Sequence, residues 1–168
     1  MTLDARGYRD IWGNFATGVT VITTDVGGRL HGMTANGVVS VSLDPLLMIV
    51  CVDKNTRCHE QLRAAGKFGI SFLGQDQEAI SSLFAQRGDP EESQLRGMPY
   101  HAGRHGTPIL DGSIAYLECR VADVLPGGDH DLFVGEALGG EILRKDAAPL
   151  LFFRGKYRQL AEQARTQP

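Results

Sequence analysis

The pattern of hydrophobic and polar positions predicts short strands joined by tight turns. Residues 3–15 place apolar side chains at helical spacing, which predicts an N-terminal helix. Residues 19–24 are almost all β-branched, and we expect them to pair, across a Gly27-Gly28 turn, with an extended run over 30–42. Seven consecutive apolar residues at 46–52 predict a strand that is buried on both faces.

The second half of the chain continues in the same manner. Asn55 or Thr56 is expected to cap a helix that runs to about Ala65 and ends at Gly66. The further elements expected are a strand over 68–73, a helix over 76–85, a surface excursion over 86–112, and strands around 117–121, 132–136 and 150–153. At least six short strands with peripheral helices predict a mainly β fold, arranged as a closed or nearly closed antiparallel barrel.

The N-terminal helix carries an apolar stripe formed by Tyr8, Ile11, Trp12 and Phe15. Such a stripe covers either the chain's own sheet or a partner subunit. Amphipathic helices usually pack on their own domain, so we favour packing within the chain.

Length and composition fit one globular domain over 1–168. The chain has 168 residues, of which 42% are hydrophobic and 22% charged. Its net charge of −3 provides no electrostatic footprint for nucleic acid or a membrane surface. No apolar run approaches the roughly 18 residues of a spanning helix, and the N-terminus lacks a signal peptide. We therefore expect a cytoplasmic protein whose three cysteines are reduced.

Two segments combine polar side chains with a strand position. The first runs over 32–37 and leads into 40–42, and its Thr34 and Asn36 suit the edge of a planar heterocycle. The second runs over 51–57, where a strand leads into the start of a helix. Together the two segments predict a phosphorylated cofactor that lies across the mouth of a barrel.

The anion site in this prediction is the helix N-terminus, flanked by Lys54, Thr56 and Arg57. Free N–H groups and the helix dipole favour negative charge there. The alternative interpretation is a helix cap beside ordinary solvated charges.

Other chemistry has little support in the sequence. The glycine-rich nucleotide loops and the serine-hydrolase elbow are missing. The only metal-like groupings are Cys58-His59 and His101-x-x-x-His105, so we expect no metal site. A third polar segment, 127–131, places His130 in a glycine turn that permits close approach to a ligand.

Six motifs in one order resemble the short-chain NAD(P)H:flavin oxidoreductase family. Its members are the flavin reductase components of two-component flavin-dependent monooxygenases. The motifs are FATGVTV at 15–21, GMTAN at 32–36, SVSLDP at 40–45, CVDK at 51–54, GDH at 128–130 and FRGKY at 153–157. The match covers about 8–160. Gly37 departs from it, because many relatives have a serine at that position.

This resemblance implies a split-barrel FMN-binding fold, a homodimer, and FMN or FAD bound near the dimer interface. It implies hydride transfer from NADH or NADPH to flavin N5 by positioning alone, with no catalytic side chain, and a monooxygenase that receives the reduced flavin. NADH is favoured, because no obvious basic cluster awaits a 2′-phosphate. The alternative is a flavin-binding electron-transfer protein of the same fold with little or no reductase turnover.

The resemblance also implies which residues form the sites. The residues expected to contact flavin are Thr34, Ala35, Asn36, Gly37, Ser40, Val41, Ser42, Cys51, Val52, Asp53, Lys54, Asn55, Thr56, Phe84, Ala85 and Arg87. Nicotinamide is expected to contact His130 and Tyr157.

Overall fold

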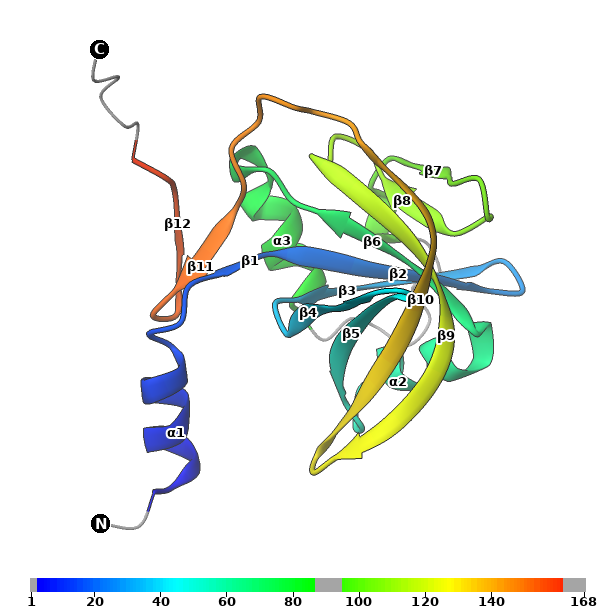
Figure 1. The fold of residues 1–168 in the computed structure, drawn as a ribbon. Helices are drawn as coiled ribbons and strands as arrows, with labels where there is room; N and C mark the ends of the chain where they lie inside the picture. The colour runs from blue at the N-terminus through cyan, green and yellow to red at the C-terminus, as the bar shows by residue number, and fades with distance from the viewer. Residues whose placement is uncertain (1–2, 87–94, 162–168) are drawn as a thin grey trace.

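The computed structural model describes residues 3–86 and 95–161 and is mainly β (Figure 1). The helical elements are α1 (Ala5–Trp12), α2 (Arg57–Ala65), α3 (Glu78–Phe84) and the 3-10 turns η1 (Gln75–Gln77) and η2 (Leu95–Gly97). The strands are β1 (Thr17–Gly18), β2 (Thr20–Val26), β3 (Arg29–Ala35), β4 (Val38–Leu43), β5 (Leu46–Asp53), β6 (Lys67–Phe72), β7 (Tyr100–Ala102), β8 (Pro108–Leu110), β9 (Ala115–Gly127), β10 (His130–Ile142), β11 (Leu151–Phe153) and β12 (Lys156–Arg158).

Seven strands form one antiparallel sheet in the order β3-β2-β6-β9-β10-β5-β4. Its edge strands, β3 and β4, are consecutive along the chain and separated only by Asn36 and Gly37. No ladder joins these two strands in the described ranges, so hydrogen bonds do not close the sheet. The mainly β class predicted from the sequence is confirmed, whereas closure into a barrel is not seen in the pairing.

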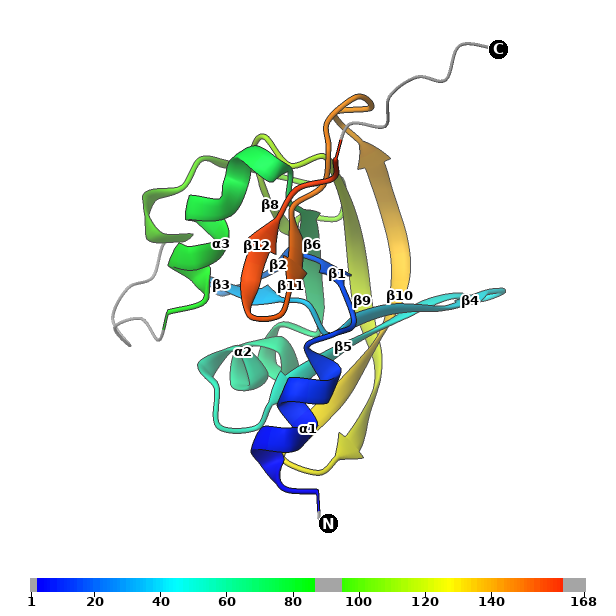
Figure 2. The same ribbon diagram turned by 90° about the vertical axis from the view of Figure 1, so that its left-hand side faces the viewer.

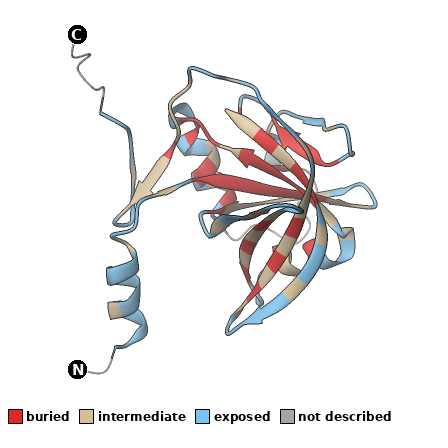
Figure 3. Cartoon of the chain, in the orientation of Figure 1, coloured by how far each residue is buried: buried red, intermediate tan, exposed pale blue. Residues whose placement is uncertain are grey.

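The main core lies on the inner face of this sheet, where the central strands are buried (Figure 3). Val50, Phe68 and Phe133 are completely buried there, and α2 adds Cys58 and Leu62 to the same cluster. A second cluster, which includes Leu73, Phe84, Leu110 and Leu150, packs beneath α3 and the small β1-β11-β12 sheet.

Local signals placed several elements correctly. The β2–β3 hairpin turns at Gly27 and Gly28, whose φ angles of 61° and 85° favour glycine. Helix α2 ends at Gly66 in the left-handed conformation, as expected of a C-terminal glycine. All three cysteines are free, as predicted.

Three expectations were wrong in detail. The run over 30–42 is two strands, because β3 pairs with β2 while β4 pairs with β5. Strand β5 is buried on alternate residues only, since its outer side is open rather than covered. The excursion over 86–112 contains a short hairpin, β7–β8, whose Pro108–Leu110 strand is completely or almost completely buried.

Helix α1 stands away from the sheet (Figures 1 and 2). Its end is joined to the β11–β12 turn by Arg154, which donates from its backbone N to Gly13 O and from Nε to Asn14 Oδ1. The stripe side chains Tyr8, Ile11 and Trp12 remain 56–64% exposed. The expectation that this stripe packs within the chain is therefore wrong. Among the described helices, none is long and apolar enough to span a membrane.

Candidate functional site

The side of β5 and β10 that faces away from the core, here called the outer face, carries Cys51, Asp53 and His130. Antiparallel pairing places His130 opposite Asp53 and Leu132 opposite Cys51, and directly paired residues share a face. Their neighbours Val50, Val52, Asp131 and Phe133 point inward and are buried. The structure thus brings two predicted flavin residues next to the predicted nicotinamide residue His130.

The β3–β4 connection borders the outer face at Gly37. The N–H of Cys51 donates to Gly37 O at 2.9 Å. A Cβ atom at Gly37 would lie 3.3 Å from the Cβ of Cys51, so a side chain at position 37 would crowd Cys51. Partial burial raises the pKa of the Cys51 thiol, which keeps it neutral at physiological pH.

The residues before Gly37 have three different environments. Thr34 donates from Oγ1 to Ser81 O on α3 at 2.7 Å. Ala35 is buried, and Asn36 is exposed with its Nδ2 3.4 Å from Thr17 Oγ1. Thr34 is thereby anchored to α3, whereas Asn36 remains available at the surface.

Strand β4 carries the predicted Ser40-Val41-Ser42 segment at a bulge. Ser40 pairs with Met48 and Ser42 with Leu47, so Val41 is the extra residue between them. Ser40 and Val41 are exposed, while the Oγ of Ser42 accepts from the N–H of Asp44. The bulge re-aims this segment relative to β5.

The side chains expected to face a phosphate are already engaged locally. Lys54 Nζ donates to Gly128 O at 2.7 Å, and Asn55 donates from both N and Nδ2 to Asp53 Oδ1. The Thr56 hydroxyl donates to Asp53 O and makes no bond to the helix that it precedes. The Thr56 side chain therefore does not cap α2. An anion at the N-terminus of α2 would meet the backbone N–H groups of its first turn.

Helix α3 and β12 bring Tyr157 to Ser81, whose carbonyl oxygen accepts from Thr34. The Tyr157 hydroxyl lies 2.8 Å from Ser81 Oγ, and its ring packs edge-on against Phe152. Phe84 is only 3% exposed and belongs to the second core cluster, while Ala85 is exposed. Arg87, also predicted to contact flavin, lies outside the described residues.

His130 follows the β9–β10 turn directly. Its Nδ1 lies 2.8 Å from Asp129 Oδ1, and this hydrogen bond with the nearby imidazole lowers the pKa of Asp129. The structure therefore separates the two predicted nicotinamide residues into different contacts, His130 with Asp129 and Tyr157 with Ser81.

Sequence reasoning missed a cluster on the inner side of the same turn. The Asp131 carboxylate contacts Lys54, His59 and Arg63. A signal existed, because Asp131 occupies an inward position of a strand in phase with Phe133, where a charged residue is unusual. Ser81 carried no such signal, since its role depends on where α3 lies against β3.

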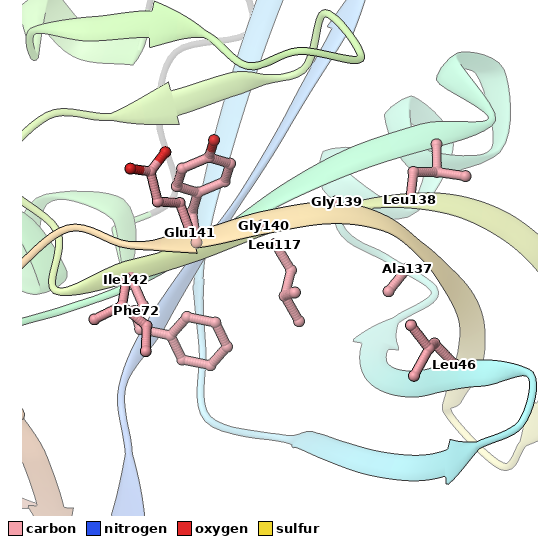
Figure 4. Close-up of a pocket in the computed structure, with 11 residues that line it drawn as sticks. Leu46, Phe72, Leu117, Ala137, Leu138, Gly139, Gly140, Glu141 and Ile142 are labelled. Carbon is pink, nitrogen blue, oxygen red and sulfur yellow. The ribbon is translucent and has the colours of Figure 1, made fainter.

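An apolar cavity of about 520 Å³ lies at the ends of β9 and β10 that are farthest from the turn between them (Figure 4). Leu46, Phe72, Leu117 and Ile142 are among its lining side chains. None of the described residues that were predicted to contact flavin or nicotinamide lines it. Its lining suits apolar side chains better than a phosphate.

Comparison with known proteins identifies the family. The model of the flavin reductase like domain matches residues 12–161. The chain is 40% identical over 139 residues to a probable flavin reductase of Rhizobium meliloti, covering 82% of this chain but only 44% of that relative. It is 37% identical over 163 residues to an NADH-dependent flavin reductase of a Rhodococcus species, covering 95% of this chain and 89% of the relative.

Two further similarities cover more than four fifths of both chains. The reductase subunit HsaB of a flavin-dependent monooxygenase from Mycobacterium tuberculosis is 36% identical, over 92% of this chain and 82% of that subunit. The NADH:FAD oxidoreductase SgcE6 of Streptomyces globisporus, solved in complex with NAD and FAD fragments, has a TM-score of 0.88 and 34% identity, over 98% of this chain and 99% of that one. The chain belongs to the family of flavin reductase like domains.

Proposed function

We propose that this protein is an NADH-dependent flavin reductase that transfers hydride to FMN or FAD. The observation that carries the proposal is the outer face, where β5–β10 pairing places Cys51 and Asp53 beside His130. Relatives named as NADH-dependent flavin reductases support the same activity. We also propose that residues 1–168 form one domain and that its sheet, open between β3 and β4, is a split barrel.

The residues at the outer face fit a flavin. The exposed amide of Asn36 offers both a donor and an acceptor to a heterocycle, and the neighbouring Gly37 is exposed and carries no side chain. The first turn of α2, which Thr56 does not cap, offers backbone N–H groups to a phosphate. Bound flavin supplies the N5 atom that accepts hydride from NADH.

The protein contributes positioning rather than acid–base chemistry. Backbone groups of β5 hold one reactant at the outer face, and His130 orients the nicotinamide of the other. Correct orientation of two bound reactants supplies a large part of such a rate enhancement. Tyr157 fixes α3 through Ser81 and so holds Thr34 in place.

The first test is NADH oxidation by purified protein, followed by the loss of NADH absorbance, with FMN, FAD and riboflavin added in turn. Turnover that depends on added flavin supports the proposal and shows which flavin is preferred. Protein that retains flavin through gel filtration yet oxidises NADH negligibly would instead be an electron-transfer protein of the same fold.

The role of His130 is tested by its alanine variant. We expect His130→Ala to raise the KM for NADH roughly tenfold, a loss of about 1.4 kcal/mol of binding free energy, with a smaller effect on flavin affinity. His101→Ala is the matched control, because His101 forms a similar exposed pair with Asp111 at 2.7 Å, away from the outer face. Equal KM values for His130→Ala and the wild type would remove His130 from nicotinamide binding.

We further propose a homodimer. The α1 stripe, the exposed Val39, Val41 and Leu43 of β4, and the rim of the cavity at Ile142 form apolar surfaces that are unusual on a monomer. Light scattering should give twice the chain mass, and a monomeric wild type would refute the proposal.

The remaining partner is a flavin-dependent monooxygenase that receives the reduced flavin. The support is the relative HsaB, named as a reductase subunit of such an enzyme. We place the reaction in the cytoplasm, where three unpaired thiols remain reduced. Adding an oxygenase component should increase NADH consumption only if reduced flavin is transferred or released.

A further inference from the structure

A buried carboxylate lies behind the glycine turn that carries His130. Asp131 is 6% exposed, yet it is charged and contacts three basic side chains. Its Oδ2 lies 2.8 Å from His59 Nε2 and 2.8 Å from Arg63 Nη2, and its Oδ1 lies 3.4 Å from Lys54 Nζ. We call these four residues the Asp131 cluster.

The sequence builds this cluster from a strand and a helix. Asp131 points inward from β10 together with Phe133, because inward positions recur every second residue. His59 and Arg63 are four residues apart on α2 and therefore lie on one face of it. Both also contact the Phe133 ring. The His59 ring is edge-on to it with the two centroids 5.3 Å apart, and the Arg63 Cζ lies above it, 5.8 Å from the centroid. The cluster therefore joins α2 to the first residues of β10.

Lys54 extends the cluster to the turn itself. Its Nζ donates to Gly128 O at 2.7 Å, and its backbone N–H donates to Asp129 O at 3.1 Å. Lys54 also directly follows Asp53, the residue that pairs with His130. One side chain thus connects the glycine turn, the loop that leads into α2, and the buried carboxylate.

We propose that Asp131 is a positioning residue for nicotinamide binding, which holds Lys54 and α2 against the turn at 128–129 and thereby fixes His130 on the outer face. Asp131 and His130 are adjacent in β10 and point to opposite faces, so the carboxylate acts through the backbone and not by touching a reactant. This inference rests on the nicotinamide role proposed above for His130.

The geometry also explains why a charge is needed there. The hydrogen bond from His59, followed by that from Arg63, lowers the pKa of Asp131 to about 2, so the carboxylate is ionised at neutral pH. An amide of the same shape cannot attract three basic groups at once. Asp131→Asn therefore removes the charge that holds the turn while it keeps the volume of the side chain.

The experiment measures KM for NADH, kcat and flavin affinity for Asp131→Asn. We expect KM for NADH to rise roughly tenfold because the turn no longer holds His130 where it binds the nicotinamide, with kcat at saturating NADH and flavin affinity changed much less. Glu118→Gln is the matched control: Glu118 is a 1% exposed carboxylate that accepts from His105 N and Thr107 Oγ1. It lies nine residues from the turn along β9, about 30 Å. This control should lower the melting temperature and leave KM unchanged.

A double mutant separates this inference from the proposed function. If Asp131 acts through His130, adding Asp131→Asn to His130→Ala should raise KM no further. An unchanged KM in His130→Ala would refute the nicotinamide role of His130, whatever Asp131→Asn does. A raised KM in His130→Ala together with a wild-type KM in folded Asp131→Asn would overturn the inference about Asp131 alone.

A milder variant is available if Asp131→Asn does not fold. Arg63 is half exposed, with 50% of its side-chain area accessible, so Arg63→Gln removes one partner of the carboxylate without opening the core. We expect a smaller rise in KM for NADH, in the same direction. A lowered melting temperature with no rise in KM would show that the cluster only stabilises the fold.

Discussion

Replacing Gly32 with alanine tests how α3 is seated on β3. A Cβ atom at Gly32 would lie 2.6 Å from Cε1 and 2.8 Å from Cδ1 of Phe84, and 3.3 Å from Cδ2 of Leu95. Phe84 is 3% exposed and packed within the second core cluster, so its ring has little room to move aside. The Phe84 ring thus occupies the space that any side chain at position 32 would need.

The size of the effect follows from this overlap. Forcing an extra methyl group into a packed core typically costs 1–3 kcal/mol, so we expect Gly32→Ala to lower the free energy of unfolding by about 2 kcal/mol. For a domain of this size, that corresponds to a fall in Tm of roughly 4–8 °C. Thermal and urea denaturation measure both quantities. Flavin affinity should also fall, because α3 carries Ser81, the acceptor for Thr34.

Two variants check the reasoning. Gly18→Ala is the control, because a Cβ there has no neighbour within 4 Å, and its stability should stay within about 0.5 kcal/mol of the wild type. Adding Phe84→Leu to Gly32→Ala replaces the ring with a smaller side chain, so the double mutant should lose less stability than the sum of the single mutants. A wild-type Tm for Gly32→Ala would refute the account.

Three further predictions address the site. The pKa of Asp131 is lowered from 3.8 to about 2, so the ionised carboxylate stabilises the fold fully above about pH 5 and loses this effect as the pH falls toward 2. In acid denaturation, the difference in stability between the wild type and Asp131→Asn should therefore shrink from about pH 5 to about pH 2. Thr34→Val should cost about 1 kcal/mol for the lost hydrogen bond to Ser81 and weaken flavin binding measured by fluorescence quenching. A thiol reagent should modify Cys51 much faster than the buried Cys58 and Cys119, because burial raises the pKa of those two thiols to about 12. Added flavin should slow the modification of Cys51, and an unchanged rate would place flavin elsewhere.

The elements that the sequence predicted well are those set by neighbouring residues. A glycine pair defines the β2–β3 turn, and Thr56 and Gly66 delimit α2, because turns and helix ends depend on the conformations of a few consecutive residues. Strand burial was predicted less well. Residues 46–52 of β5 are all apolar, so their sequence does not reveal that Cys51 faces outward.

Contacts between residues far apart in the sequence determine which strands pair and which elements meet, and local patterns do not predict them. The break between β3 and β4 falls at Asn36-Gly37, a dipeptide that marks turns, but which strand each one joins depends on distant pairing. Likewise, Tyr157 of β12 contacts Ser81 of α3, whereas His130 pairs with Asp53 of β5. Sequence order alone gives neither relation, since each depends on contacts between residues far apart along the chain.

The exposed α1 stripe is another feature whose tertiary contacts the sequence pattern did not predict. Helical spacing correctly predicted an apolar face, but the pattern alone does not distinguish a face that packs on its own sheet from one that packs on another chain. Trp12 and Ile11 are 61% and 64% exposed, while Arg154 holds the end of the helix through its hydrogen bonds to Gly13 and Asn14. Large exposed apolar patches on soluble proteins mark interaction sites, and the α1 stripe therefore supports the homodimer proposed above.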